Sequence, residues 1–454
     1  MAGAGAAPGR AEHGGRMNVA VIGTGYVGLV TGACFSEFGV QVTCVDAVEE
    51  KIDALKRGEI PIYEPGLDDL VARNVRSGRL AFTTDSREAI DQALVVFIAV
   101  GTPAADDGGT NLEYIESVAR EIGRCIDSYK VVVTKSTAPV GTGDKVRAWI
   151  QEEVDGRGAS VPFSVASNPE FLREGAAIGD FMRPDRVVIG TDPGDHQAIA
   201  IMKDLYRPLY LNETPFVETD RHTAELSKYA ANAFLATKIS FINEMSILCE
   251  EVGGAVQAIA RAMGLDRRIG SKFLHAGPGF GGSCFPKDTL SAAHFARELG
   301  HEFAIVEASI RVNQRQLERM VAKIESALDG DVRGRTVAIL GLSFKPETDD
   351  IRDAPALTIV RGLLDRGASI RAYDPAAMAE AGRAIPEMQL CKDVYEAVQG
   401  ADAMVIVTEW NEFRMIDLGR AKEAMAEARM IDLRNVYDRP RIERAGFRYW
   451  GVGR

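Results

Sequence analysis

A glycine motif set between a short apolar strand and a helical segment constrains the fold of this chain more than any other feature. Residues 18–35 read NVAVIGTGYVGLVTGACF, which places Gly23, Gly25 and Gly28 in the spacing G-x-G-x-x-G. Glycine at these positions permits a tight turn, close approach of a phosphate to the backbone, and close packing of the helix on the strand. The free N–H groups of the following helix then favour an anion. The motif predicts a Rossmann-type dinucleotide site, and a glycine-rich turn that binds nothing is the alternative.

An acidic residue after the second predicted strand indicates which dinucleotide binds. The segment VTCVD ends at Asp46, near the offset of about 20 residues at which such folds place a ribose-binding carboxylate. Because its charge repels a 2′-phosphate, we expect NAD rather than NADP. We also expect cofactor contacts from Tyr26 and Val27 inside the motif and from Lys51. A turn role for Asp46 and a solvated Lys51 are the alternatives.

The alternation of strand and helix patterns divides the chain into domains. Short β-branched runs between helical segments occupy 17–214 and indicate a buried parallel sheet. Within 215–315, the stretch AELSKYAANAFLATKISFINEMSILCEEV has no Pro or Gly and predicts one long helix in a helical connector or dimerisation domain. A second strand–helix alternation fills 316–454, and Ala- and Gly-rich residues 1–16 are expected to be a disordered extension. The predicted fold class is α/β, with two Rossmann-like doubly wound domains joined by the helix and a small helical domain.

Composition excludes several classes of partner. The net charge of −12 disfavours binding to nucleic acid or an anionic membrane, since no basic run offsets it. The longest fully apolar run, Ala93 to Val100, is too short to cross a bilayer. The six cysteines form no CxxC pair and no zinc-type cluster, so we expect no metal site, reduced thiols and a cytoplasmic location.

One cysteine stands in a context that favours chemistry. In HAGPGFGGSCFPKD, glycines and a proline fix an irregular loop, Cys284 follows it, and Pro286 opens a helical pattern. A helix N-terminus and the neighbouring Lys287 would lower the thiol pKa from its usual value of about 8.5, although Asp288 opposes this. Cys284 is therefore a candidate nucleophile, and a buried structural cysteine is the alternative.

Three separated segments, GTGYVG, SNPEFLREG and GFGGSCFPKD, together resemble the UDP-glucose/GDP-mannose dehydrogenase family. These nucleotide-sugar dehydrogenases oxidise a sugar's primary alcohol to a carboxylate. KSTAPVGT, ELSKYAANAFLA, FKPETDDIRDAPA and VTEWNEF extend the resemblance from residue 17 nearly to the end of the chain. FGGSCFPKD and VTEWNEF are most similar to members that act on UDP-glucose. Members acting on GDP-mannose or UDP-N-acetylhexosamines are alternatives, and an NAD-binding scaffold without activity is the non-enzymatic one.

The resemblance implies an active site between the two sheets and a homodimer, or higher homo-oligomer, in which the long helix packs against its mate. Oxidising an alcohol to an acid removes four electrons, so two NAD molecules are reduced in turn. A thiol at Cys284 would hold the aldehyde as a thiohemiacetal and then as a thioester that water cleaves. The implied catalytic residues are Cys284, Lys228, Asn232, Glu174, Asp288 and Thr137.

The roles implied by the resemblance are specific. Glu174 would activate water with help from Glu170, Lys228 would stabilise charge on the sugar oxygen, and Asn232 would orient substrate or water. Asp288 would position water. Further cofactor contacts would come from Thr102, Thr137, Glu174, Lys287 and Arg352. The UDP-sugar would contact Glu170, Phe171, Leu172, Glu174, Lys228, Asn232, Phe273, Leu274, His275, Ala276, Gly277, Gly281, Phe344, Lys345 and Arg434, with Arg268 supplied by the partner subunit.

Ordinary structural roles remain as alternatives for these positions. Glu170 and Glu174 are spaced i, i+4, so both would be solvated acids on one helical face if the segment were helical. Asp288 would be a first-turn acid that stabilises its helix, and Asn232 a packing amide. The threonines would be turn or cap hydroxyls, and any single arginine a surface residue.

Overall fold

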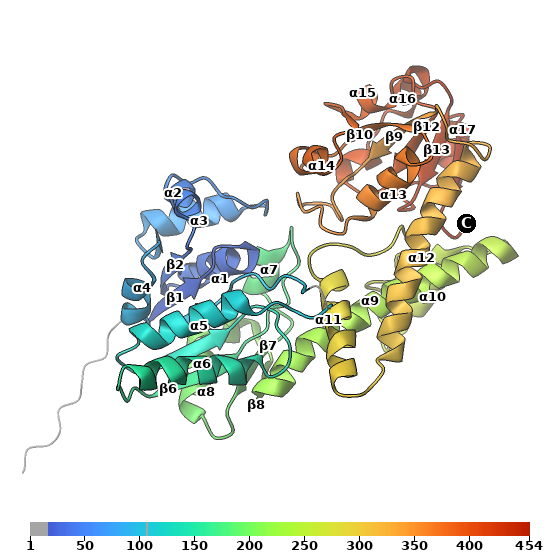
Figure 1. The fold of residues 1–454 in the computed structure, drawn as a ribbon. Coiled ribbons are helices and arrows are strands. Elements are labelled where there is room, and N and C mark those ends of the chain that lie inside the picture. The colour runs from blue at the N-terminus through green and yellow to red at the C-terminus, as the bar shows by residue number, and fades with distance from the viewer. Residues whose placement is uncertain (1–16, 106–107) are drawn as a thin grey trace, which may run out of the picture.

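The computed structural model describes residues 17–105 and 108–454, so the extension expected for 1–16 lies outside the described residues. Two α/β domains, each built on a mostly parallel sheet, lie at the two ends of a long helix (Figure 1). The predicted fold class is therefore confirmed. No helix within the described ranges combines the length and apolar character that crossing a bilayer requires.

The first domain contains an eight-stranded sheet in the order β3-β2-β1-β4-β5-β6-β7-β8. Its strands are β1 (Asn18–Ile22), β2 (Gln41–Val45), β3 (Leu80–Thr83), β4 (Val95–Ile98), β5 (Lys130–Thr134), β6 (Phe163–Ser167), β7 (Val187–Thr191) and β8 (Phe216–Asp220). All neighbours pair in parallel except β6 and β7. The helices are α1 (Tyr26–Glu37), α2 (Glu49–Lys56), α3 (Leu67–Arg76), α4 (Ser86–Gln92), α5 (Glu113–Cys125), α6 (Thr142–Gly156), α7 (Ala177–Met182) and α8 (His196–Leu205), with a 3₁₀ turn η1 (Arg207–Asn212).

Both faces of this sheet are buried, which explains why its central strands are mainly apolar. In β4, Val95 and Phe97 enter one core, whereas Val96 and Ile98 enter the core on the opposite face. Two strands escaped prediction because their residues lack this pattern. β3 (LAFT) is buried on only one face, and the edge strand β8 (FVETD) is mostly exposed. The first sheet consequently continues to Asp220, six residues beyond the boundary expected at 214.

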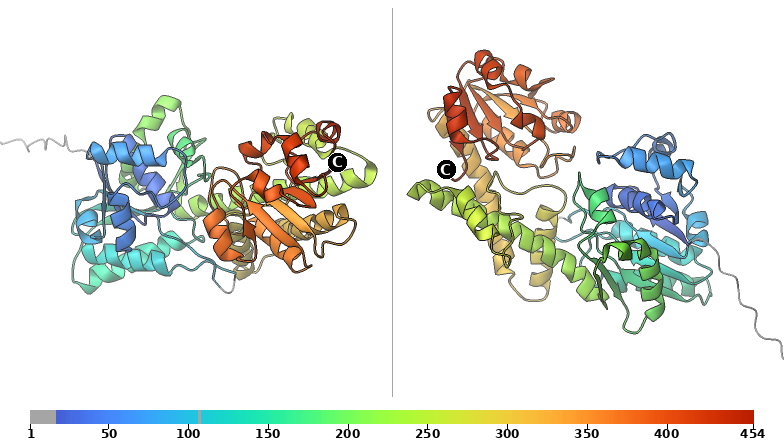
Figure 2. Two further views of the ribbon diagram at one scale, coloured as in Figure 1. Left: turned by 90° about the horizontal axis from the view of Figure 1, so that it is seen from above. Right: turned by 180° about the vertical axis from the view of Figure 1, so that it is seen from behind.

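The predicted long helix is α9 (Arg221–Val252), which has 32 residues. The Asp220 carboxylate accepts a hydrogen bond from the Thr223 N–H at its start, and Gly253 ends it in the left-handed conformation at φ 71°. Three more helices complete the connector, α10 (Val256–Gly264), α11 (Phe285–Glu298) and α12 (Ala304–Ala327), so the last one crosses the boundary expected at 315. Figure 2 shows α9 extending from the first domain to the second.

The second domain has a six-stranded sheet in the order β11-β10-β9-β12-β13-β14, and every pair is parallel. Its strands are β9 (Thr336–Leu340), β10 (Ser369–Tyr373), β11 (Gln389–Leu390), β12 (Ala403–Ile406), β13 (Arg429–Asp432) and β14 (Arg448–Gly451). The helices are α13 (Pro355–Leu364), α14 (Met378–Ala384), α15 (Val394–Val398), α16 (Leu418–Ala424) and α17 (Arg439–Arg444), with a 3₁₀ turn η2 (Asn411–Arg414).

The loop after the first strand is anchored in the same way in both domains, but only one anchor is open to a ligand. Asp46 at the end of β2 accepts hydrogen bonds from the backbone N–H and hydroxyl of Thr24, at 2.9 and 2.7 Å. Asp374 after β10 accepts the equivalent bonds from Ser343, at 3.0 and 3.1 Å. The indole of Trp410 also donates to Asp374, whose side chain is buried. The second domain thus keeps the topology but covers the carboxylate.

Candidate active site

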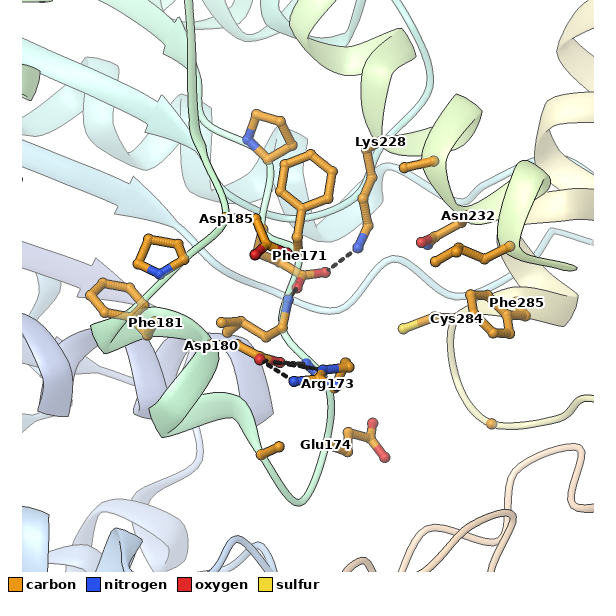
Figure 3. A pocket seen from close by; sticks show the side chains of 18 of the residues that line it. Phe171, Arg173, Glu174, Asp180, Phe181, Asp185, Lys228, Asn232, Cys284 and Phe285 are labelled. Carbon is orange, nitrogen blue, oxygen red and sulfur yellow. Dashed lines mark hydrogen bonds and ion pairs between the residues drawn. The ribbon is translucent and has the colours of Figure 1, made fainter. Parts of the chain in front are cut away.

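A cleft of about 1030 Å³ lies between the first domain, α9, the loop before α11 and the second domain (Figure 3). The first domain contributes the irregular segment 168–176, and the second domain contributes 344–347. α9 contributes Lys228 and Asn232, which are one helical turn apart, and Cys284 lies opposite them at the start of α11. Residues far apart in the sequence are therefore assembled around one space.

Cys284 is the N-cap residue of α11, directly after the glycine loop. Its sulfur lies 3.4 Å from the Ser283 hydroxyl. Burial and the carboxylate of Glu170 raise the pKa of the thiol above its ordinary value, although the Lys228 ammonium opposes them. The expected depression of this pKa was therefore wrong. A helix N-terminus favours the anion by only about 0.5–1 kcal/mol, which is too little to overcome desolvation of a largely enclosed thiolate.

Lys228 and Glu170 form a buried ion pair, with Nζ 2.8 Å from Oε1 and only 4% and 5% of the side chains exposed. Figure 3 shows this contact beside the Phe171 ring. Burial disfavours both charges. Even so, the Lys228 ammonium and the Leu172 backbone N–H, which donates at 2.6 Å, hold the pKa of Glu170 below its ordinary value. The Glu170 carboxylate in turn raises the pKa of Lys228 against the effect of burial. Lys228 is therefore a cation facing the cleft.

Asn232 and Asp288 form a second polar contact beside Cys284. The Asn232 amide donates to Asp288 Oδ2 at 2.6 Å, and Lys287 Nζ lies 2.7 Å from Asp288 Oδ1. Asp288 is almost fully buried, so its two oxygens fix the amide and the ammonium in place. The amide oxygen of Asn232 is left to accept a hydrogen bond from a ligand or water in the cleft.

Glu174 lies on a turn between β6 and α7, not on a helix, so it does not share a helical face with Glu170. Its carboxylate accepts a hydrogen bond from the Ser283 hydroxyl at 2.9 Å and lies 3.5 Å from the Arg352 guanidinium. Burial and the neighbouring Asp350 raise the pKa of Glu174 to about 7. A carboxylate with that pKa, linked to the Cys284 thiol through the Ser283 hydroxyl, is suited to act as a general base at neutral pH.

The glycine motif fits a dinucleotide. A Cβ on Gly23 would lie 2.6 Å from the Ala99 carbonyl oxygen, and one on Gly28 would lie 1.9 Å from the Gly23 carbonyl oxygen, so both must be glycine. A Cβ on Gly25 would meet no atom within 4 Å, which leaves the backbone open to a phosphate. α1 begins at Tyr26 without a side-chain cap, so its first N–H groups face outwards.

Asp46 and Lys51 stand together at the end of β2. Lys51 Nζ lies 2.9 Å from Asp46 Oδ2. Burial would raise the pKa of Asp46, but hydrogen bonds from Thr24 and Lys51 lower it below its ordinary value. The carboxylate is therefore ionised and half-buried, which suits ribose hydroxyls and disfavours a phosphate.

Comparison with known proteins identifies the scaffold. Three sequence profiles described as the UDP-glucose/GDP-mannose dehydrogenase family match this chain, the NAD binding domain over 17–210, the central domain over 222–315 and the UDP binding domain over 338–439. The chain belongs to the UDP-glucose/GDP-mannose dehydrogenase family. It is accordingly an NAD-dependent dehydrogenase, and NAD is its cofactor.

Relatives of the family cover nearly the whole chain. A UDP-glucose 6-dehydrogenase of Rhizobium meliloti is 54% identical over 439 residues, which span 96% of this chain and 100% of that protein. A UDP-glucose 6-dehydrogenase of Bacillus subtilis is 47% identical over 96% of this chain and 93% of its own length. The structure of a UDP-glucose dehydrogenase from Pyrobaculum islandicum superposes with a TM-score of 0.87 at 39% identity, covering 95% of this chain and 96% of that one.

Most of the residues predicted to bind the substrate, together with the predicted nucleophile, line the cleft. The lining includes Glu170, Phe171, Leu172, Glu174, Lys228, Asn232, Phe273, Gly281, Cys284, Phe344 and Lys345. Lys345 Nζ lies 5.2 Å from the centre of the Phe344 ring, so a cation and an aromatic face enter together from the second domain. That Phe344 and Lys345 contact the UDP-sugar stays a prediction.

The predicted backbone track from Phe273 to Gly277 reaches this cleft only at its first residue. The described residues that line the cleft do not include Leu274, His275, Ala276 or Gly277. The Gly277 N–H donates to Asn243 Oδ1 at 2.9 Å, and its carbonyl accepts from Gln316 at 2.7 Å. Because the N–H and the carbonyl of Gly277 already have protein partners, neither group is free to bind a pyrophosphate in this cleft.

Three predicted arginines also lie outside the cleft lining. Arg434 is anchored by its Nε to the Val407 carbonyl at 2.7 Å and packs beside Gly277. Arg268 is 88% exposed and pairs with Asp266 on its own loop, so its expected role in a partner's site stays a prediction. Arg352 lies near Glu174 and pairs with Asp350 at 2.7 Å.

The two predicted threonines meet at the carboxyl edge of the first sheet. The Thr102 hydroxyl, after β4, donates to the Thr137 carbonyl, after β5, at 2.8 Å. Thr137 shares a small recess with Lys228 and Glu225. Thr137 therefore lies near the lysine of the cleft, and Val27 lies in the first turn of α1.

Several charged or polar residues of the cleft were missed, among them Arg186, Ser283 and Lys135. Arg186 stacks over the Phe171 ring at 3.5 Å, and Ser283 bridges Glu174 and Cys284. Lys135 is buried against Asn168 and Tyr206, and burial lowers its pKa to about 8. A lysine that directly follows the apolar strand KVVVT was the available signal for Lys135. The other two depend on tertiary contacts.

Proposed function

We propose that this chain oxidises UDP-glucose to UDP-glucuronate, with reduction of two NAD and with Cys284 as covalent nucleophile. The observation that carries the proposal is the assembly of a thiol, a buried lysine and a carboxylate of pKa about 7 around one cleft. The proposal takes its substrate from the relatives of 54% and 47% identity, both of which are UDP-glucose 6-dehydrogenases. In all, one primary alcohol, two NAD⁺ and one water give one carboxylate, two NADH and three protons.

The first half of the reaction needs a stabilised sugar oxygen. NAD bound at the glycine motif supplies the hydride acceptor for each oxidation. As the alcohol gives its hydroxyl proton to water and a hydride to NAD, its oxygen gains partial negative charge, which the Lys228 ammonium stabilises from a largely dry environment. Glu170 keeps that ammonium charged, because its carboxylate raises the pKa of Lys228. Before oxidation, the amide oxygen of Asn232, which Asp288 holds in place, accepts a hydrogen bond from the sugar hydroxyl and so orients it.

Cys284 then retains the aldehyde. Its sulfur forms a bond to the aldehyde carbon, and the thiol proton ends on the former carbonyl oxygen, giving a neutral thiohemiacetal. Because this proton moves only from sulfur to oxygen overall, a thiol with a raised pKa is compatible with the step. The same carbon would then give a second hydride to NAD, and its hydroxyl proton would pass to water, which leaves a thioester.

Glu174 completes the reaction by activating water. The carboxylate takes a proton from water as the hydroxide attacks the thioester carbon, the carbon–sulfur bond breaks, and sulfur regains its proton. Ser283 holds the carboxylate within reach, since it contacts both Glu174 and Cys284.

A panel of nucleotide sugars tests the substrate. We expect two NADH per UDP-glucose, and little NADH with GDP-mannose or a UDP-N-acetylhexosamine. Turnover of GDP-mannose alone would overturn the substrate assignment. Absence of NADH with every nucleotide sugar, while NAD still binds, would favour the non-enzymatic scaffold.

We also propose that the protein forms a homodimer whose interface is α9, and that it is located in the cytoplasm. Phe234, Phe241 and Leu248 recur every seven residues on that helix and are 64%, 46% and 56% exposed. Such a row is a helix-packing seam, and burying it against a second copy would also bring Arg268 towards the partner's site. The six cysteines are all free thiols, which supports the cytoplasmic location.

A further inference from the structure

A buried carboxylate outside the catalytic set holds the turn that carries Glu174. Glu64 lies in the loop between α2 and α3 and is almost fully buried. Its Oε2 accepts the Gly175 N–H at 2.6 Å, and its Oε1 accepts the N–H groups of Ala177 and Ile178 at 2.8 and 3.4 Å. One side chain therefore fixes the backbone immediately after Glu174.

The same carboxylate connects that turn to the dinucleotide helix. The hydroxyl of Tyr26, the first residue of α1, donates to Glu64 and accepts the Gly175 N–H at 2.9 Å. Burial and Glu64 raise the pKa of Tyr26, so its hydroxyl stays protonated and serves as the donor. The side chain of Tyr26 is thus committed to the turn, which leaves its backbone N–H for the cofactor.

The opposite side of the turn faces the second domain. Gly175 has φ +75°, and a Cβ there would lie 2.3 Å from the Glu347 carbonyl oxygen. The Glu174 carboxylate projects towards Ser283 and lies 3.4 Å from the Thr348 hydroxyl. Figure 3 shows Glu174 on its loop across from Cys284. The turn is held between α1 on one side and the second domain with the cysteine loop on the other.

We propose that Glu64 is a positioning residue for the hydrolytic step, which it serves by holding the Glu174 carboxylate against Ser283 and Cys284. The inference rests on the proposed function. Lys228 and Asn232 come from α9, and Cys284 comes from the loop before α11, so Glu64 forms no described hydrogen bond to any of these three side chains. Its only described hydrogen bond with the dinucleotide helix comes from the Tyr26 hydroxyl. Its loss frees the base and leaves the two oxidations intact.

The test is single-turnover kinetics on Glu64→Gln, with NADH absorbance and intact-mass spectrometry on the same samples. We expect a burst of two NADH per site at close to the wild-type rate, then a steady state slower by about 100-fold, the loss that a misplacement of about 1 Å produces. The mass should show a nucleotide-sugar thioester. Glu59→Gln is the matched control, because Glu59 lies in the same loop but pairs only with exposed Arg57 in the contacts described.

The outcomes separate the two claims. If Glu64→Gln slows the NADH burst and the steady-state rate by the same factor, and no adduct is found, then Glu64 has only a structural role and the inference is overturned. A wild-type enzyme that forms no NADH from UDP-glucose would refute the proposed function itself, and the inference with it. If Glu64→Gln does not fold, Tyr26→Phe decides the matter, because it removes a single hydroxyl group together with its two contacts, to Glu64 and to the Gly175 N–H. The same split between burst and steady state supports the inference, and its absence overturns it.

Discussion

Replacing Lys228 by methionine removes the cation that pairs with Glu170 but keeps most of the apolar stem. At 2.8 Å and an effective dielectric of about 20, the attraction between the two charges is about 6 kcal/mol. Desolvation of both groups offsets much of this, so the intact pair adds little net stability. Removing one partner leaves the other buried and unpaired, which costs about 3–5 kcal/mol. We therefore expect Lys228→Met to lower the free energy of unfolding of the first domain by that amount.

The double variant Lys228→Met/Glu170→Met separates pairing from catalysis. With both charges gone, we expect stability to return to within about 1–2 kcal/mol of the wild type, while activity stays lost. Urea denaturation followed by circular dichroism, beside an NADH assay, measures both. A single variant that loses less than about 1 kcal/mol, or a double variant less stable than either single one, would refute the reasoning.

The two groups are both charged, and each is stabilised by the other, only within a defined pH window. The pKa of Glu170 is lowered on folding, so its contribution is present above the ordinary value of about 4.3 and is lost as pH falls through the folded pKa. The pKa of Lys228 is raised, so its contribution is present below about 10.4 and is lost as pH rises through the folded pKa. Wild type and Lys228→Met should therefore differ most between these limits.

Three further predictions follow from particular contacts. Asp46→Asn removes the charge that faces a 2′-phosphate and should reduce the kcat/KM preference for NAD over NADP by about tenfold, or ~1.4 kcal/mol, whereas the exposed Asp53→Asn should leave it unchanged. The kcat of the wild type should rise with pH through about 7 as Glu174 loses its proton, and Ser283→Ala, which removes a hydrogen bond that lowers this pKa, should move the midpoint upwards; a pH–rate profile with no rise near 7 would contradict the base assignment. Phe241→Glu should convert a dimer to a monomer in sedimentation experiments, and an unchanged mass would exclude α9 as the interface.

The sequence was most informative where one residue type decides local geometry. The absence of Pro and Gly before Gly253 predicted α9 because nothing interrupts its hydrogen-bond ladder, and Gly253 does end the helix. The spacing of Gly23 and Gly28 predicted a close strand–helix contact, and the structure leaves no room for a Cβ at either position. The strand pattern failed at β8 (FVETD), where only the first two residues are apolar and no residue is fully buried.

The site was less predictable because its energetics depend on neighbours from other elements. In α9 the apolar Leu226 is exposed, whereas the charged Lys228 is buried because Glu170, from the loop after β6, pairs with it. The sequence placed Cys284 at a helix start but could not weigh burial against the helix dipole, so the direction of its pKa shift was wrong. Likewise, the backbone of Gly277 is hydrogen-bonded to Asn243 and Gln316, which are 34 and 39 residues away in the sequence.

The most direct test of covalent catalysis is peptide mapping of Glu174→Gln after incubation with UDP-glucose and NAD. This variant keeps Cys284, Lys228 and Asn232 but lacks the base that would activate water. The account predicts two NADH per site and a nucleotide-sugar acyl group on the peptide that contains Cys284. An unmodified Cys284 peptide alongside the same NADH yield, or full activity in Cys284→Ala, would contradict it.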